Sequence, residues 1–233
     1  MNSKKYFNMR WLFSCLIFFS CSSKDKIEYI SKAEQQAFQQ VKVRQKEWLA
    51  EHLMEIKNKI SSGDLIVREG NDFTSQSLRQ LNRKNKTYSH IGILSKENDS
   101  IIVYHIMGGE WNPDAIILRE SLSKFVSPTI NNQFAIYSLK VSDDDKKQIV
   151  KNAVKLKEDD VRFDMKFDLQ TKDKMYCAEY VYHCVQPILR STNIPTSQID
   201  DFQFVGIDDI FLLPEATVLL TVNYLNLDLK TSK

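Results

Sequence analysis

The chain has 233 residues and a formal net charge of +2, from 32 basic and 30 acidic side chains. This length suits one globular domain with a sizeable core plus appendages. Basic and acidic residues are interspersed without a sustained basic stripe, which argues against nucleic-acid binding. The sequence also contains no internal repeat, glycine-rich phosphate loop or CxxC pair.

The N-terminus has the pattern of an export signal. Three basic residues precede the apolar run 11–19, which is too short to span a membrane comfortably. The Ser-Cys pair that ends at Cys21 resembles a bacterial lipoprotein signal, in which this cysteine becomes the lipid-modified first residue. An ordinary secretory signal is the alternative, and Cys15 is a second possible acceptor inside the apolar run. We expect a signal peptide at 1–20 and a lipid-anchored protein of the cell envelope, on the periplasmic or surface side.

A polar tether at 22–30 leads into a long helix over 31–60, which has no Gly or Pro and ends before Gly63. Apolar residues form one stripe along this helix, so we expect it to pack on the domain. The stripe comprises Phe38, Val41, Trp48, Leu49, Leu53, Ile56 and Ile60.

The rest of the chain reads as short strands followed by helices. Strands are expected at 64–68, 88–94, 101–106, 115–118, 134–139 and 217–225. Short helical segments are expected at 75–81, 121–126, 142–156, 177–186 and 207–210, with Ser142 as an N-cap. Strands in a row with segregated helices predict an α+β fold with an antiparallel sheet. The expected organisation is a tether and N-terminal helix at 21–60 and a domain at 61–230.

Cys177 is a candidate nucleophile at the start of a predicted helix. Unpaired backbone N–H groups and the helix dipole meet there, which favours the thiolate and could hold an oxyanion. The alternative is a small buried apolar side chain. Cys184 lies two turns away, roughly 10 Å along a helix, whereas a disulfide needs Cα atoms within about 7 Å. We therefore expect both thiols to stay free.

His90 and His105 lie on the two strands of a predicted hairpin. A four-residue loop at 96–99 would place them directly opposite each other, on one face. His52 and His183 lie on helices and are poor candidates for a base. A thiol nucleophile needs a base and a third group that orients the base, and Cys177, His90 and His105 supply these roles.

Two other interpretations of these residues stay open. The histidines could be core residues with local hydrogen bonds. The same three side chains could also ligate zinc, although no fourth ligand follows at short spacing. We expect neither a metal nor a cofactor.

Five segments together resemble the circularly permuted papain-fold cysteine hydrolases, specifically the YiiX-like group, which is related to NlpC-type cell-wall peptidases and lecithin–retinol acyltransferase-like enzymes. In that family the histidine strand precedes the nucleophile helix, as His90 precedes Cys177 here. The resembling segments are Gly63-Asp64-Leu65-Ile66, Tyr88-Ser89-His90-Ile91-Gly92-Ile93, Val103-Tyr104-His105, 162–168 and Tyr176-Cys177-Ala178-Glu179-Tyr180-Val181.

The resemblance implies a permuted papain-like domain with Cys177 as nucleophile and His90 as base. His105 falls where many YiiX-like sequences have Glu, although the wider family also uses His. Glu179 would cap the helix or contact substrate. Tyr88 and Tyr176 flank the catalytic positions and would line the cleft, or else pack in the core.

The expected function is a lipid-anchored cysteine hydrolase of amide bonds, with envelope peptide as a plausible substrate. A lipid ester hydrolase or acyltransferase of the same fold is one alternative, and a non-catalytic envelope binding module is another. The expected partners are an envelope peptide or lipid substrate and the membrane, without nucleic acid.

The export signal makes a direct prediction for the mature protein. Cleavage before Cys21 should leave this residue as a lipidated N-terminus, because the small residue before it ends the apolar run. Mass spectrometry of the protein from its native host measures this. An intact N-terminus, or a first residue other than Cys21, would contradict the lipoprotein assignment.

Overall fold

The computed structural model describes residues 31–171, 173–199 and 202–227. The signal peptide at 1–20, Cys21 and the tether at 22–30 lie outside these residues. By its internal contacts the chain divides into two units, Met1–Phe38 and Gln39–Lys233. Within the described part, no helix combines the length and apolar character needed to cross a membrane.

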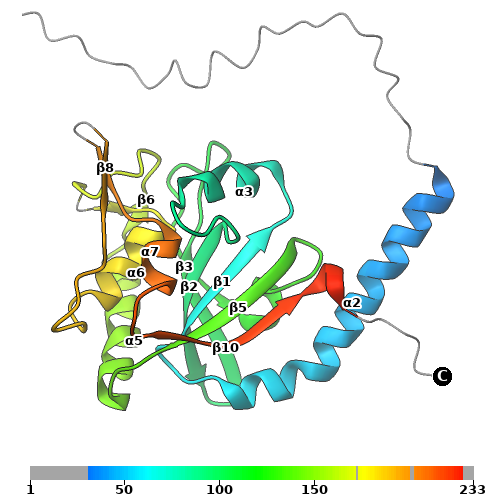
Figure 1. Cartoon of the computed structure of the whole chain (residues 1–233), viewed down its shortest axis with the longest axis horizontal. Coiled ribbons are helices and arrows are strands. Elements are labelled where there is room, and N and C mark those ends of the chain that lie inside the picture. The colour runs from blue at the N-terminus through cyan, green and yellow to red at the C-terminus, as the bar shows by residue number, and fades with distance from the viewer. Residues whose placement is uncertain (1–30, 172, 200–201, 228–233) are drawn as a thin grey trace, which may run out of the picture. The chain divides into compact units, whose positions relative to one another are not determined.

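A six-stranded sheet is the centre of the second unit, and all of its neighbouring strands are antiparallel (Figure 1). The order across the sheet is β10-β5-β1-β2-β3-β4. The strand bounds are β1 Leu65–Gly70, β2 His90–Glu97, β3 Ser100–Ile106, β4 Ile117–Ser121, β5 Asn131–Leu139 and β10 Ala216–Asn223. Two small sheets pair β6 Arg162–Phe163 with β7 Lys174–Met175, and β8 Ser197–Ile199 with β9 Phe202–Phe204.

Helices cover both faces of the sheet because its strands alternate apolar side chains between two cores. One core joins Leu65, Val67 and Ile91 to helices α5 Asp143–Glu158, α6 Cys177–Val185 and α7 Ile207–Phe211, which lie together in Figure 1. The other core joins the opposite face to α2 Lys32–Lys59 and α4 Leu122–Phe125. The short helix α3 Phe73–Leu78 follows β1 and continues into a 3₁₀ turn, η1 Arg79–Leu81; a second 3₁₀ turn, η2 Tyr224–Asn226, follows β10.

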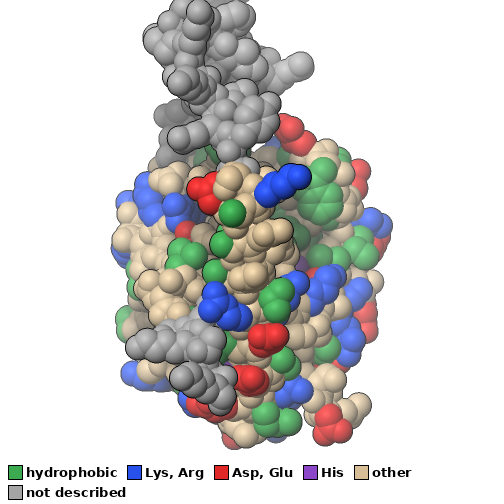
Figure 2. All heavy atoms as spheres, turned by 90° about the vertical axis from the view of Figure 1, so that its right-hand side faces the viewer, with side chains coloured by type: hydrophobic (Ala, Val, Ile, Leu, Met, Phe, Trp, Pro, Cys, Tyr) green, Lys and Arg blue, Asp and Glu red, His purple; other side chains and the backbone are tan. Residues whose placement is uncertain are grey.

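The predicted α+β class is confirmed, and most elements lie where the sequence places them. In the long helix, the later part of the predicted stripe packs on the sheet: Leu49, Ile56 and Ile60 are buried. Phe38 is 57% exposed, so the stripe does not continue as buried surface to that position. On the face shown in Figure 2, basic and acidic side chains are interspersed rather than segregated, as the sequence indicates.

The predicted register of the β2–β3 hairpin is wrong by two residues. Both strands extend further than expected, so that Glu97 pairs with Ser100 across a turn of Asn98 and Asp99. Asn98 adopts a positive φ of 52°, a conformation that asparagine tolerates and that two-residue hairpin turns use. Because side chains alternate with a period of two, the shift leaves both histidines on one face but makes them diagonal neighbours.

A buried ion pair connects the start of β1 to α5. Asp64 is 1% exposed, and its carboxylate lies 2.8 Å from the Lys146 Nζ and accepts the backbone N–H of Ser61. The preceding Gly63 has a φ of 85°, and a Cβ there would lie 2.6 Å from the Lys146 carbonyl oxygen. This close approach of α5 requires glycine.

Replacing Asp64 with alanine should destabilise the fold by about 3 kcal/mol, because it leaves the Lys146 ammonium unpaired in a largely buried position. Urea unfolding followed by circular dichroism measures this change. The matched control is Asp159→Ala, which breaks the exposed pair with Lys155 and should cost far less, because solvent screens an exposed pair. Equal losses for the two variants would contradict a structural role for the buried pair.

Candidate active site

Cys177 is the first residue of α6, as predicted, and its side chain is buried. Helix α6 packs against β2, and the backbone N–H groups of Ile91, Ala178 and Cys177 itself act to lower the pKa of the thiol. Cys177 therefore lies beside the strand residue that follows His90. Like Cys184, it is a free thiol.

The direction of the thiol pKa differs from the sequence expectation. Burial raises the pKa of Cys177 to about 11, although the N–H groups of Ile91 and Ala178 and the charge of Arg68 act to lower it. The helix N-terminus is present, but desolvation of the sulfur outweighs it. The resting site therefore holds a protonated thiol.

His90 and His105 are hydrogen-bonded to each other. His90 Nε2 lies 2.9 Å from His105 Nδ1, and both rings are buried on the face of the sheet that packs against α4, where each contacts Phe125. Cys177 belongs to the core on the other face, with Ile91. Burial lowers the pKa of both histidines, and the positive charge of Arg68 lowers them further. Both imidazoles are therefore neutral at pH 7, which a base must be before it accepts a proton.

Gly92 leaves space for this contact. A Cβ at this position would lie 2.7 Å from Val103 Cγ1 and 3.2 Å from His105 Cβ. Any larger residue would therefore displace the Val103 side chain and crowd His105. The glycine explains how two histidines offset by two residues can still meet.

Glu120 on β4 extends the histidine pair, and the sequence analysis did not identify it. Its Oε2 lies 3.5 Å from His105 Nε2, and its other oxygen forms an ion pair with Lys124. Burial alone would raise the pKa of Glu120, but its interactions with His105 and Lys124 outweigh burial and lower the pKa to about 2. The carboxylate is therefore ionised at neutral pH.

The charge of Glu120 selects one set of tautomers. An ionised carboxylate favours a proton on His105 Nε2, so His105 Nδ1 accepts from His90 Nε2–H. His90 then has its lone pair on Nδ1. The predicted contact between His90 and His105 is confirmed, whereas a direct contact between Cys177 and His90 stays a prediction.

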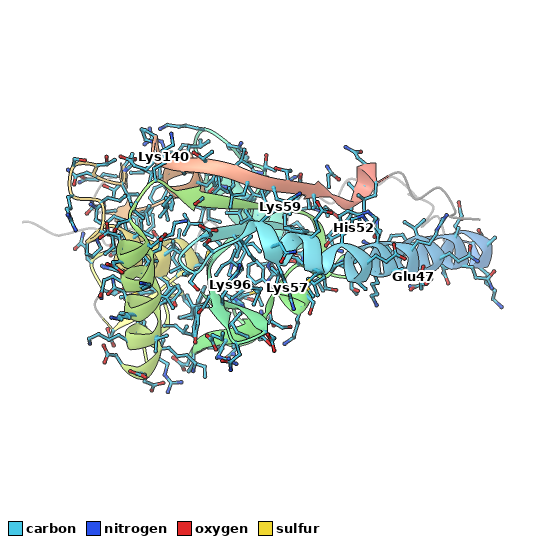
Figure 3. The ribbon with its side chains drawn as sticks, turned by 90° about the horizontal axis from the view of Figure 1, so that it is seen from below. Glu47, His52, Lys57, Lys59, Lys96 and Lys140 are labelled. Carbon is cyan, nitrogen blue, oxygen red and sulfur yellow. The ribbon has the colours of Figure 1, made fainter. Side chains whose placement is uncertain are left out.

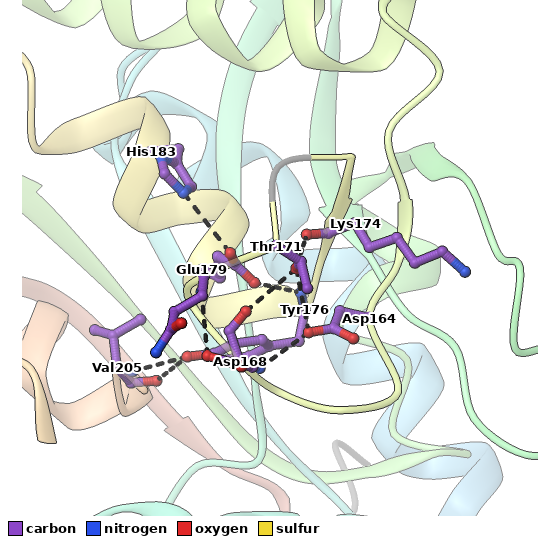
Figure 4. Close-up of polar contacts among 9 residues, drawn as sticks. Asp164, Asp168, Thr171, Lys174, Tyr176, Glu179, His183 and Val205 are labelled. Atoms are coloured by element: carbon purple, nitrogen blue, oxygen red, sulfur yellow. Dashed lines mark hydrogen bonds and ion pairs between the residues drawn. The ribbon is translucent and has the colours of Figure 1, made fainter. Parts of the chain in front are cut away.

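Glu179 supports the helix start rather than lining an open cleft. It is fully buried, its Oε2 accepts the backbone N–H of Tyr176 at 3.3 Å, and its Oε1 lies 3.7 Å from His183 Nε2 (Figure 4). Tyr176 is held by Val205, whose carbonyl accepts its hydroxyl and whose N–H donates to it. Of the two predicted roles for Glu179, the capping role matches these contacts.

The remaining aromatic and histidine candidates divide between cleft, core and surface helix. Tyr176 lines a small cavity together with Cys177. Tyr88 is buried and packs edge-on against Phe211 in the core. His52 stacks on Trp48 along α2, the helix that also carries Glu47 in Figure 3.

Two cavities lie beside these residues, and both are lined by Leu78 and Ser89. The smaller one, about 30 Å³, contains Cys177, and the larger one, about 240 Å³, contains His90. Arg68 also lines the larger cavity. Because side chains alternate along β1, the sequence predicts only that Arg68 lies on the opposite face of the sheet from Val67. The sequence alone could therefore not identify Arg68 as part of the site.

The comparisons with known proteins point to one fold. No family model matches the chain, and no curated protein sequence matches it. Among solved structures, the metalloprotein YiiX from Escherichia coli O157:H7 is similar at a TM-score of 0.57 and 16% sequence identity, over 70% of this chain and 98% of that chain. The chain therefore has a YiiX-like α+β fold.

The described histidines do not form a metal site of the usual kind. Across residues 31–171, 173–199 and 202–227, no three His, Cys, Asp or Glu side chains gather as potential ligands. His90 Nε2 and His105 Nδ1 face each other at 2.9 Å, so these nitrogens bond to one another instead of converging on an ion. The metal in the description of YiiX is therefore not carried over to these residues.

The raised thiol pKa predicts how Cys177 reacts with iodoacetamide. Its alkylation rate should rise about tenfold per pH unit from pH 7 and level off only near pH 11, because thiolate forms above the pKa. Peptide mapping by mass spectrometry assigns the adduct to Cys177, with glutathione as the unperturbed thiol. A midpoint below that of glutathione would contradict the neutral thiol and would indicate a preformed thiolate–imidazolium pair.

Proposed function

We propose that this protein is a cysteine hydrolase of amide bonds, with Cys177 as nucleophile, His90 as base, and His105 and Glu120 as positioning residues. The observation that carries the proposal is the connected series Glu120, His105 and His90, whose last member precedes Ile91, the β2 residue whose N–H acts to lower the pKa of Cys177. A nucleophile, a base and groups that orient the base form the arrangement used for thiol acyl transfer.

In the first step, Cys177 Sγ attacks the substrate carbonyl carbon while its proton passes to His90 Nδ1. The imidazolium formed is stabilised through His105 by the negative charge of Glu120. The carbonyl oxygen becomes an oxyanion, which backbone N–H groups at the start of α6 can stabilise. Because thiol and imidazole are both neutral at rest, proton transfer accompanies the attack.

Collapse of this intermediate breaks the C–N bond and leaves a thioester on Cys177. His90 gives its proton to the departing amine. Water then attacks the thioester, with His90 as base, and releases the carboxylic acid and the free thiol. The cycle consumes one water and restores every protonation state.

The sequence supports an extension of this proposal to the cell envelope. Export through the signal at 1–20 and lipidation at Cys21 would hold the enzyme at a membrane, where an envelope peptide is a candidate substrate. The resemblance to NlpC-type peptidases favours an amide over a lipid ester.

Substitutions at the site should reduce acylation in a defined order. Cys177→Ser and His90→Ala should each lose about 10³-fold or more, because they remove the nucleophile and the base. His105→Ala and Glu120→Gln should lose roughly 10- to 100-fold, because they act only through His90. The rate of p-nitrophenolate release from p-nitrophenyl acetate and the mass of the acetylated Cys177 peptide measure this step.

Matched controls separate catalysis from packing. His52→Ala removes a histidine from α2, and Glu97→Gln removes a carboxylate from β2 that binds Arg119 and Tyr104. Both should leave acylation unchanged. In the positioning variants, the pH dependence of acylation should also shift, which a purely structural loss would not produce. If the folded wild type never acylates Cys177, the protein is a binding module instead.

A further inference from the structure

Arg68 is a buried cation in the middle of the sheet. It is 5% exposed and lies opposite His90 in the β1–β2 register. Its guanidinium carbon lies 4.7 Å from the centre of the Phe125 ring. Nη1 donates to the carbonyl of Phe125 and to the side-chain oxygen of Asn131, both at 3.3 Å.

These contacts leave much of the guanidinium without strong acceptors. The contact of Nη2 is the thioether sulfur of Met107 at 3.3 Å, and a thioether is a weak acceptor. The buried Nε has no hydrogen-bond partner within the described part of the chain. No carboxylate among those described residues lies within ion-pair distance of Arg68. Burying a charge in this way is costly unless something completes its hydrogen bonds.

The cavity beside Arg68 supplies the space for such a partner. Its volume is about 240 Å³, enough for a group the size of an amino-acid residue, and it is lined by Arg68, His90, Asp72, Met107 and Trp111 among others. Trp111 is 70% exposed, so part of the rim faces solvent. The cavity shares Leu78 and Ser89 with the lining of the smaller Cys177 cavity, and the charge of Arg68 acts on the Cys177 thiol. A group bound at Arg68 would therefore lie in the cavity that adjoins the one at Cys177.

We propose that Arg68 binds a carboxylate of the substrate in this cavity, so that the enzyme acts on amides whose acyl or amine portion carries a free carboxylate close to the scissile bond. The inference rests on the proposed hydrolase function and specifies its substrate class. A carboxylate matches the planar donors of a guanidinium, and its charge compensates a cation that has no bonded anion.

The charges around Arg68 favour a carboxylate over a phosphate. Asp72 lines the same cavity, where it accepts hydrogen bonds from Ser75, and Glu120 interacts with Arg68 through space. The charged groups near Arg68 are thus two carboxylates and its own guanidinium, because the two histidines are neutral. A singly charged anion is repelled less by the two carboxylates than a doubly charged phosphate monoester would be.

A pair of alkylating reagents tests the proposal without knowledge of the natural substrate. Iodoacetate and iodoacetamide have the same reacting carbon, but only iodoacetate carries a carboxylate. The ratio of their second-order rate constants at Cys177 cancels changes in thiol pKa, because both react with the same thiolate. We expect Arg68→Met to lower the iodoacetate-to-iodoacetamide ratio at least tenfold, whereas Arg119→Met, which removes an exposed arginine bound to Glu97, should leave it unchanged.

A binding measurement separates this inference from catalysis. In full-length Cys177→Ala protein, the Arg68 Nε–H resonance in ¹H–¹⁵N spectra reports binding at this site. From its titration we expect N-acetylglycine to bind with a dissociation constant at least tenfold lower than that of N-acetylglycinamide or methyl phosphate. This titration decides the proposal even if Cys177 proves unreactive, which would refute the hydrolase function alone. If the Arg68→Met variant does not fold, the reagent ratio is measured in Arg68→Lys instead, together with this titration. An unchanged reagent ratio together with no preference for N-acetylglycine, or tighter binding of methyl phosphate, would overturn the carboxylate site.

Discussion

The hydrogen bond between two buried, neutral imidazoles is the constraint on which the site depends. His90 and His105 can share it only because both rings are desolvated and one ring accepts where the other donates. If His105 were protonated, its Nδ1 would also carry a hydrogen, and two donors would face each other at this contact, whereas a proton added to His90 Nδ1 leaves the bond intact. Gly92 provides the close approach, and Glu120 stabilises the one tautomer order that leaves His90 Nδ1 as a base.

The same desolvation explains why the thiol is protonated at rest. Cys177 is the first residue of α6, where burial outweighs the favourable N–H groups of the helix start. A neutral thiol and neutral imidazoles avoid the cost of separate buried charges at rest. In the proposed mechanism, the oxyanion and imidazolium would form together within a low-dielectric site, where fixed dipoles stabilise charge more strongly than water-exposed groups would.

The proposed role of Arg68 would link this electrostatic balance to substrate binding. Its charge lowers the pKa of His90 and of Cys177, and it lies opposite His90 on β1. A bound carboxylate would reduce that field, which would make His90 a stronger base when the site is filled. Glu179 has a different part: buried beneath the helix start, it bonds to the backbone N–H of Tyr176 and fixes the position from which Cys177 begins α6.

The sequence by itself determined the α+β class, the helix that starts at Cys177 and the common face of His90 and His105. These features depend on local spacing, and the side-chain period of two kept the histidines together although the register was wrong by two residues. Tertiary structure decided the turn at Asn98, the arrival of Glu120 from β4, the burial of Arg68 and the direction of the thiol pKa. Each of these depends on desolvation or contact between residues far apart in the chain, which local periodicity does not encode.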